Sequence, residues 1–196
     1  MSSLKSDFQL VSTESMVSKV AYDDALARIG RFIKRKKRFP GPVIIYGHKE
    51  WPMVAGIHSC LENGWTYVPV DSQTPRRRLL DIINAAKPSL LLDCTESLTP
   101  EDIPGPEILR SSEVLTASLT DDGNFIGADA GEKEYRDAYI MFTSGSTGKP
   151  KGVPVSVKSF KTFLQWIDEE IFPEREEKYR IFNAVSLSFD MSLYEI

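Results

Sequence analysis

The sequence predicts an α/β fold with a predominantly parallel sheet and flanking helices. Two observations support this prediction: helical and strand-type segments alternate between residues 22 and 93, and the turns that join them are short. A strand that returns to the same sheet after a crossing helix runs parallel to its predecessor. We expect one domain in this chain of 196 residues, with a polar segment at 1–20 ahead of the patterned part at 21–196.

The helices of the first half are predicted from apolar residues at helical spacing. The first helix begins near Tyr22 and ends before Pro40, in a basic turn that suits the negative end of the helix dipole. The second spans residues 53–63 and stops at Gly64, and the third begins at Thr74, a cap residue followed by proline. Short apolar runs predict strands at residues 43–47, 65–71 and 89–93.

The second half of the chain is less regular. Residues 94–135 are rich in proline, glycine, serine and acids without a sustained period, which predicts a surface excursion with a short strand near 107–109. An amphipathic helix is predicted over 156–171, and Asp190 suits the cap of a further helix. The sequence stops soon after this cap, so we expect a fragment or one part of a larger module. Strands are predicted at 137–143, 152–156 and 179–187. The inward positions of the helix over 156–171 are predicted to be Val157, Phe160, Phe163, Leu164, Ile167 and Ile171.

The composition argues against several classes of protein. A formal net charge of −4 argues against a dedicated nucleic-acid binder. No apolar run approaches the roughly 20 residues that cross a bilayer, and the first residues have no signal-peptide core. Cys60 and Cys94 are too few for a disulfide framework and have no metal-ligand spacing. We therefore expect a cytoplasmic protein with reduced thiols, no nucleic-acid partner and no membrane insertion.

The segment TSGSTGKPKG, residues 143–152, has the properties of an anion-binding loop. Its glycines permit close approach to a ligand, its hydroxyls donate hydrogen bonds, and its two lysines supply positive charge for phosphate oxygens. The spacing does not fit a Walker A loop, in which four residues separate the glycines and Ser or Thr follows the lysine. A flexible linker is the alternative, but the strand-type runs on both sides favour a phosphate site. The candidate residues are Thr143, Ser144, Gly145, Ser146, Thr147, Gly148, Lys149 and Lys151.

Three segments together resemble the adenylate-forming (AMP-binding) superfamily. TSGSTGKPKG matches the phosphate-loop signature of that superfamily, LENGWTYVPVD (61–71) resembles a structural motif, and FDMS (189–192) resembles the acidic motif of its amino-acid-activating branch. The resemblance runs from about Tyr22 to the end and implies the N-terminal part of the large domain. Residues 41–83 look most like enzymes that ligate D-alanine to a carrier protein in teichoic-acid biosynthesis. Glu195, common in peptide-synthetase adenylation domains, keeps that branch open.

The resemblance implies a ligase that activates an amino acid with ATP and Mg²⁺. The carboxylate of the amino acid attacks the α-phosphate of ATP, and the acyl group then passes to the phosphopantetheine thiol of a carrier protein. By resemblance, the glycine-rich loop holds the β- and γ-phosphates, with Ser144, Thr147 and Lys151 in direct contact. Lys149 is a weaker candidate because the proline that follows it can turn its side chain to solvent.

By the same resemblance, Asp190 pairs with the α-ammonium group of the amino acid, although a helix cap is the simpler structural role. The Mg²⁺ ligands and the catalytic lysine of the superfamily are expected beyond Ile196. We therefore place no catalytic residue within this chain and expect the 196 residues alone to be inactive. Two alternatives stay open: an acyl-CoA synthetase, which has no ammonium group for Asp190 to pair with, and a non-catalytic nucleotide-binding or interaction module.

Neither histidine is assigned a catalytic role. His58 lies on a helix of buried type and is predicted to be a packed, hydrogen-bonded core residue. His48 follows a strand, where ligands of α/β folds gather, but the sequence shows no Cys, Asp or Ser partner for it.

Overall fold

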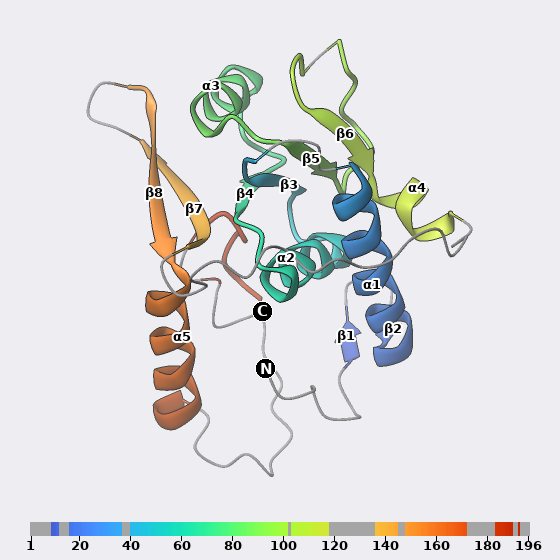
Figure 1. The fold of residues 1–196 in the computed structure, drawn as a ribbon, viewed down its shortest axis with the longest axis vertical. Helices are drawn as coiled ribbons and strands as arrows, with labels where there is room; N and C mark the ends of the chain where they lie inside the picture. The colour runs from blue at the N-terminus through green and yellow to red at the C-terminus, as the bar shows by residue number, and fades with distance from the viewer. Residues whose placement is uncertain are drawn as a thin grey trace.

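The central feature of the fold is a six-stranded sheet (Figure 1). The computed structural model describes residues 9–11, 16–36, 40–101, 103–117, 136–144, 148–171, 183–189 and 192. The strands lie in the order β6-β5-β3-β4-β7-β8, and every neighbouring pair is parallel except the hairpin of β7 and β8. The predicted fold class is therefore confirmed. The strands are β3 (Val43–Gly47), β4 (Tyr67–Asp71), β5 (Leu90–Asp93), β6 (Glu107–Arg110), β7 (Asp137–Ser144) and β8 (Pro150–Ser156).

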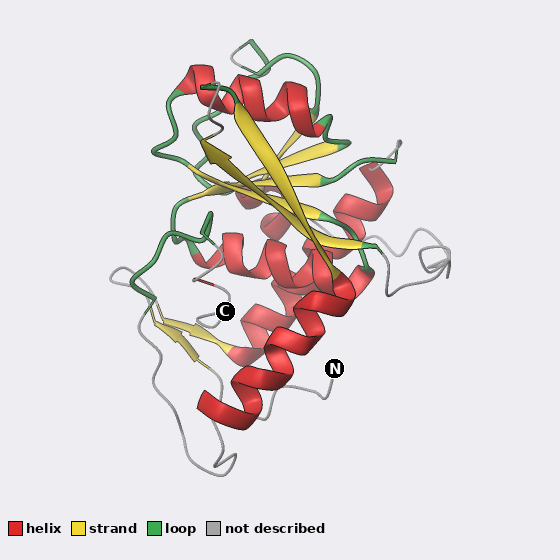
Figure 2. Ribbon diagram, turned by 90° about the vertical axis from the view of Figure 1, so that its left-hand side faces the viewer, coloured by secondary structure: helices red, strands yellow, loops and turns green. Residues whose placement is uncertain are grey.

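Helices lie on both faces of this sheet. The helices are α1 (Lys19–Lys36), α2 (Trp51–Asn63), α3 (Arg76–Ala86), α4 (Ser111–Thr116) and α5 (Val157–Trp166), and a π-helical turn, η1 (Ile167–Ile171), follows α5. Figure 2 shows α3 above the sheet and α1 and α2 below it. No helix in the described parts of the chain is both long enough and apolar enough to span a membrane.

Alternating side chains of the strands fill two hydrophobic cores. Val43 and Ile45 of β3 belong to the core shared with α1, α2 and α5, and Ile44 and Tyr46 belong to the core under α3. A parallel sheet has to be covered on both faces, which explains why its strands read as continuous apolar runs in the sequence.

The second helix shows how well local signals predict this part of the fold. α2 is buried along most of its length, with Ile57 and Cys60 fully inaccessible to solvent. It ends at Gly64, whose φ of 68° lies in the left-handed region that glycine adopts readily. The sequence predicts both the buried character and the stop at this glycine.

Several elements differ from the sequence-based expectations. The antiparallel pair of β1 (Gln9–Val11) and β2 (Met16–Ser18) lies in the segment expected to be weakly patterned, and α1 begins there too. α4 lies in the excursion for which no helix is predicted. Both departures involve short elements: β1 and β2 have three residues each and α4 has six, too few to show an apolar pattern in the sequence.

Two predictions in the last third of the chain are wrong. Ile171 is predicted to face inward but is 46% exposed, because the chain changes from α5 to the wider η1 turn and the apolar face rotates. The strand predicted at 179–187 is absent from its described part, residues 183–187. Residues 179–182 lie outside the described residues.

Candidate functional site

The fold favours ligand binding at the carboxyl ends of β3 and β4. The loop after β3 leads to α2 on one face of the sheet, and the loop after β4 leads to α3 on the other face. Ligands of open α/β sheets bind at such a switch point, because the diverging loops leave room between them. Gly47 and Asp71 are register partners at the ends of the two strands, so His48 comes next to Asp71.

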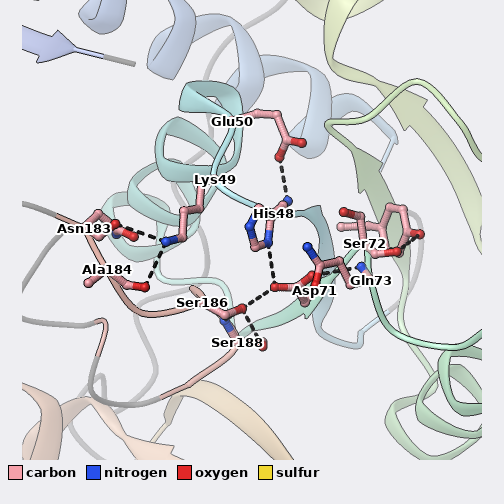
Figure 3. A network of polar contacts seen from close by, with 11 residues as sticks. His48, Lys49, Glu50, Asp71, Ser72, Gln73, Asn183, Ala184, Ser186 and Ser188 are labelled. Atoms are coloured by element: carbon pink, nitrogen blue, oxygen red, sulfur yellow. Dashed lines mark hydrogen bonds and ion pairs between the residues drawn. The ribbon is translucent and has the colours of Figure 1, made fainter. Parts of the chain in front are cut away.

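Asp71 lies at the centre of a polar network at this edge (Figure 3). Its Oδ2 accepts hydrogen bonds from Nδ1 of His48, at 2.9 Å, and from the hydroxyl of Ser186. Its Oδ1 accepts the backbone N–H of Gln73 at 2.8 Å. Only 14% of the Asp71 side chain is exposed, so a carboxylate at this position needs such partners.

The hydrogen bonds favour the ionised form of Asp71. Burial alone raises the pKa of Asp71. The hydrogen bonds from Ser186, from the Gln73 N–H and from His48 outweigh burial, so the pKa of Asp71 lies below the usual aspartate value. Because an ionised carboxylate can only accept hydrogen bonds, Nδ1 of His48 carries the proton in this contact.

A second contact joins the same two parts of the chain. Nζ of Lys49, in the loop after β3, donates hydrogen bonds to the carbonyl oxygens of Asn183, at 3.1 Å, and Ala184, at 3.0 Å. Residues 183–189 are therefore held against the β3 loop by Lys49 and against the end of β4 by Asp71, as Figure 3 shows.

The network does not form a serine-hydrolase triad. In such a triad the imidazole lies between the serine and the carboxylate and takes the serine proton. Here the carboxylate of Asp71 lies between His48 and Ser186, because both donate to the same oxygen. The arrangement orients these groups and does not activate Ser186 as a nucleophile. In the described part of the chain, no cluster of three or more His, Cys, Asp or Glu side chains is suited to a metal ion.

The predicted phosphate loop connects β7 to β8, and its described residues, 143–144 and 148–152, form the end of this hairpin, which we call the hairpin tip. Thr143 pairs with Lys151 and Ser144 pairs with Pro150 across the two strands. Cross-strand partners share one face, so the side chains of Thr143 and Lys151 lie on the same face of the hairpin. The hydroxyl of Thr143 donates to the carbonyl oxygen of Lys151 at 3.4 Å. Both side chains and that of Lys149 are exposed, which leaves two lysines accessible to an anionic ligand.

The two described glycines of the loop are needed for different reasons. Gly148 has a φ of 76°, in the left-handed region, and a Cβ there would meet nothing within 4 Å. At Gly152 a Cβ would lie 3.0 Å from Cγ2 of Ile140 and 3.1 Å from Cζ of Phe142. Gly148 therefore allows the turn, and Gly152 allows close packing against β7.

The predicted site residues fall into two groups. Thr143, Ser144, Gly148, Lys149 and Lys151 are described, and the structure brings them together around the hairpin tip. Because β7 runs parallel to β4, its carboxyl end lies on the same side of the sheet as the end of β4. Gly145, Ser146, Thr147 and Asp190 lie outside the described residues.

The network around Asp71 corrects one expectation. His48 does have partners, Asp71 directly and Ser186 through the shared carboxylate. The sequence signal for the first contact is that Asp71 ends one strand and His48 follows another, and the two strands become neighbours. Ser186 is 115 residues from Asp71, and no local pattern predicts that contact. The prediction for His58 is confirmed in part: its Nδ1 lies 2.6 Å from the hydroxyl of Tyr22, but its side chain is half-buried and does not belong to the buried core.

Comparison of the sequence with known proteins identifies a matching family and several similar proteins. The AMP-binding enzyme family matches residues 11–196. The D-alanine--D-alanyl carrier protein ligase of Listeria monocytogenes serotype 4b (strain CLIP80459) is 34% identical over 156 residues, and the ligase of the same name from Bacillus licheniformis is 36% identical over 163 residues. Each match covers 79% of this chain and 30% of the relative. The chain thus spans less than a third of the length of these relatives.

Comparison with solved structures finds chains whose fold is similar to that of this chain. The nonribosomal peptide synthetase FmoA3 in its α-methyl-L-serine-AMP bound form has a TM-score of 0.76 at 22% identity, over 97% of this chain and 20% of that chain. O-succinylbenzoate coenzyme A synthetase (MenE) from Bacillus subtilis, in complex with AMP, has a TM-score of 0.76 at 18% identity, over 96% and 49% of the two chains. The sheet and its helices thus have the same fold as the matched parts of these two structures.

Proposed function

Because this chain belongs to the AMP-binding enzyme family, whose members are adenylate-forming ligases, we propose that it is part of a ligase that activates D-alanine with ATP and passes it to a carrier-protein thiol. The observation that supports this substrate is the identity of 30–36% to D-alanine--D-alanyl carrier protein ligases across 79% of the chain. The chain spans 30% of those relatives, so the rest of the reaction requires residues that this sequence does not contain.

We assign the phosphates of ATP to the hairpin tip. Lys151 and the hydroxyl of Thr143 lie on one face of the hairpin and are exposed, which suits a ligand with several negative oxygens. Ser144 and Thr147 are the further hydroxyl donors of the loop. ATP brings the adenylyl group and carries Mg²⁺ on its phosphates, with the protein ligands of that metal outside this chain.

We assign the α-ammonium group of the amino acid to Asp190. A carboxylate in this role selects an amino acid over an acid without an ammonium group, since an unpaired charge in a closed site is costly. This assignment distinguishes the proposal from an acyl-CoA synthetase, whose substrate has no cation for Asp190.

The phosphate assignment can be tested on the 196-residue chain by equilibrium binding of ATP. Lys151→Ala removes one hydrogen bond to a charged oxygen, so we expect the Kd for ATP to rise about 10- to 100-fold. Lys158→Ala makes the same charge change at an exposed position on α5 and serves as the control. Equal ATP affinity of the Lys151→Ala variant and the unaltered chain would contradict the assignment.

The substrate can be tested by ATP–pyrophosphate exchange with a panel of acids, on the protein as the gene encodes it. We expect D-alanine to support the fastest exchange, ahead of L-alanine and of fatty or aryl acids. Exchange with a fatty or aryl acid alone would show an acyl-CoA synthetase instead. D-alanine-dependent exchange by the isolated 196 residues would contradict the expectation that this length is inactive.

A further inference from the structure

An exposed apolar stripe runs along the outer side of α5 and η1. The inner side of α5 packs on β7 and β8, where Phe160 is buried and its ring meets that of Tyr139 edge to face. On the outer side, Trp166 is 51% exposed and stacks on the half-buried Phe163, with 6.2 Å between the ring centroids. Figure 1 shows α5 below β8 at the border of the molecule. Solvent therefore reaches one side of this helix at an aromatic pair.

The π-helical turn extends this aromatic pair into a stripe. Phe163 and Trp166 are three residues apart and share a face of α5. Ile171 comes five residues after Trp166, and residues five apart are the hydrogen-bonded neighbours of a π-helical turn. The turn that moves Ile171 away from the core thus brings it toward the face of Trp166. We call Phe163, Trp166 and Ile171 the apolar stripe, and large apolar side chains gathered in this way mark an interaction surface.

The charges beside the apolar stripe are arranged against the helix dipole. Lys158 and Lys161 lie in the first half of α5, and Glu169 and Glu170 lie in η1, all four exposed. The first turn of a helix favours anions and the last turn favours cations, so this arrangement costs the isolated helix some stability. None of the four side chains forms an ion pair with another described residue. A partner with the opposite arrangement of charge would offset this cost.

A second copy of α5 and η1, packed antiparallel, has that opposite arrangement. It places the lysines of one helix against the glutamates of the other and opposes the two helix dipoles. Residue 164 is halfway between Lys158 and Glu170, so a two-fold axis near this position puts Lys158 of each copy beside Glu170 of the other. A two-fold interface forms every such contact twice. Phe163 and Trp166 lie on either side of the same position, so the apolar stripes meet at the centre with charges at the rim.

We propose that the protein forms a two-fold symmetric dimer through α5 and η1, with the apolar stripes in contact and Lys158 paired with Glu170 across the axis. The partner is a second copy of this chain, because the charges beside the stripe complement themselves in the antiparallel orientation. A parallel pair would set lysines against lysines and glutamates against glutamates. A single helix pair buries less surface than a standard interface, so we expect a weak dimer with a Kd of about 1–100 µM.

Sedimentation velocity on the protein as the gene encodes it measures this dimer. The weight-average sedimentation coefficient should rise toward the value of a dimer as the protein concentration increases through the range of about 1–100 µM. Trp166→Glu places a charge at the centre of the stripe, and because Trp166 is exposed the fold should tolerate the change. The Kd of this variant should be at least about 30-fold higher, the effect of a tryptophan at the centre of an interface. Circular dichroism verifies that the variant is folded.

Charge reversal tests the orientation of the two helices. Lys158→Glu and Glu170→Lys each set like charges opposite each other at both symmetric contacts, so each should raise the Kd about tenfold. The double variant restores opposite charges and should return the Kd to that of the unaltered protein. Arg77→Glu makes the same charge reversal as Lys158→Glu at an exposed position of α3 and serves as the control.

Each outcome decides the proposal. A dimer that Trp166→Glu abolishes, and that the two charge reversals weaken singly but not together, supports it. A monomer at every concentration overturns it, because the stripe then has no second copy to bind. A dimer that Trp166→Glu or the single reversals leave unchanged, or a double variant as weak as the single ones, indicates another surface or orientation and also overturns it.

Discussion

The replacement of Gly47 by alanine tests how closely the loop after β3 is packed. Gly47 is the last residue of β3 and precedes His48. A Cβ there would lie 2.7 Å from Oε2 of Glu50, 3.1 Å from Sδ of Met53 and 3.2 Å from Cβ of Cys94. Gly47 is not among the described glycines with positive φ, so its backbone conformation also suits alanine. Steric crowding alone therefore decides how Gly47→Ala changes the stability.

The expected loss of stability follows from two opposing effects. Overpacking of a filled site costs about 1–3 kcal/mol, and the loss of glycine's freedom in the unfolded chain returns about 0.4–1 kcal/mol. We expect Gly47→Ala to lower the free energy of unfolding by about 1–2 kcal/mol. In a chain of this size each kcal/mol lowers Tm by about 2–4 °C. Urea unfolding followed by circular dichroism measures the change, with the slope against urea unaltered.

A double variant identifies the contact responsible. Glu50 accepts the N–H of His48 at 2.6 Å, and its Oε2 is the atom nearest to the added Cβ. Glu50→Ala removes that atom, so Gly47→Ala should cost less in the Glu50→Ala background than in the unaltered chain. Strictly additive losses, or a Gly47→Ala variant as stable as the unaltered chain, would refute the crowding argument.

Three further predictions concern stability. Gly148→Ala should lower the free energy of unfolding by about 1–2 kcal/mol in urea, the cost of a left-handed conformation with a Cβ, even though the side chain has open space. Leu92 is fully buried in β5, so Leu92→Ala should lower the free energy of unfolding by about 2–5 kcal/mol in the same assay. Leu80 is half-buried and serves as the control. A smaller loss of stability in Leu92→Ala than in Leu80→Ala would contradict the prediction. The pKa of Asp71 is lowered in the folded chain, so its stabilising contribution is complete above the unfolded value of about 3.9 and is lost as pH falls below it. The stability difference between the unaltered chain and Asp71→Asn should therefore shrink as the pH falls below about 4 in acid titrations, and a difference independent of pH would argue against an ionised Asp71.

Elements with strong local patterns are those that the sequence predicts well. The strands from β3 to β5 are buried on both faces, so they appear as apolar runs, and Gly64 marks the end of α2 through its backbone conformation alone. The hairpin tip is predictable too, because the glycines and lysines of residues 143–152 occur together in one short stretch. These signals depend on neighbouring residues and not on the rest of the fold.

Contacts between distant segments are what the sequence does not predict. The bond between Ser186 and Asp71 depends on how a segment without regular structure lies against the ends of β3 and β4. A uniform helical period predicts that Ile171 faces inward, and the change to a π-helical turn alters that period within five residues. The pair of β1 and β2 consists of two strands of three residues each, too short for an alternating pattern.

The prolines of β8 also affect how the protein behaves in concentrated solution. Proline has no N–H to donate, so Pro150 and Pro154 occupy pairs with β7 that are not hydrogen-bonded, and their nitrogens point to the outer edge of the strand. β8 is the last strand in the order of the described sheet. A strand from another molecule would find two donors missing along this edge. The hairpin can therefore present its lysines to solvent without becoming a template for aggregation.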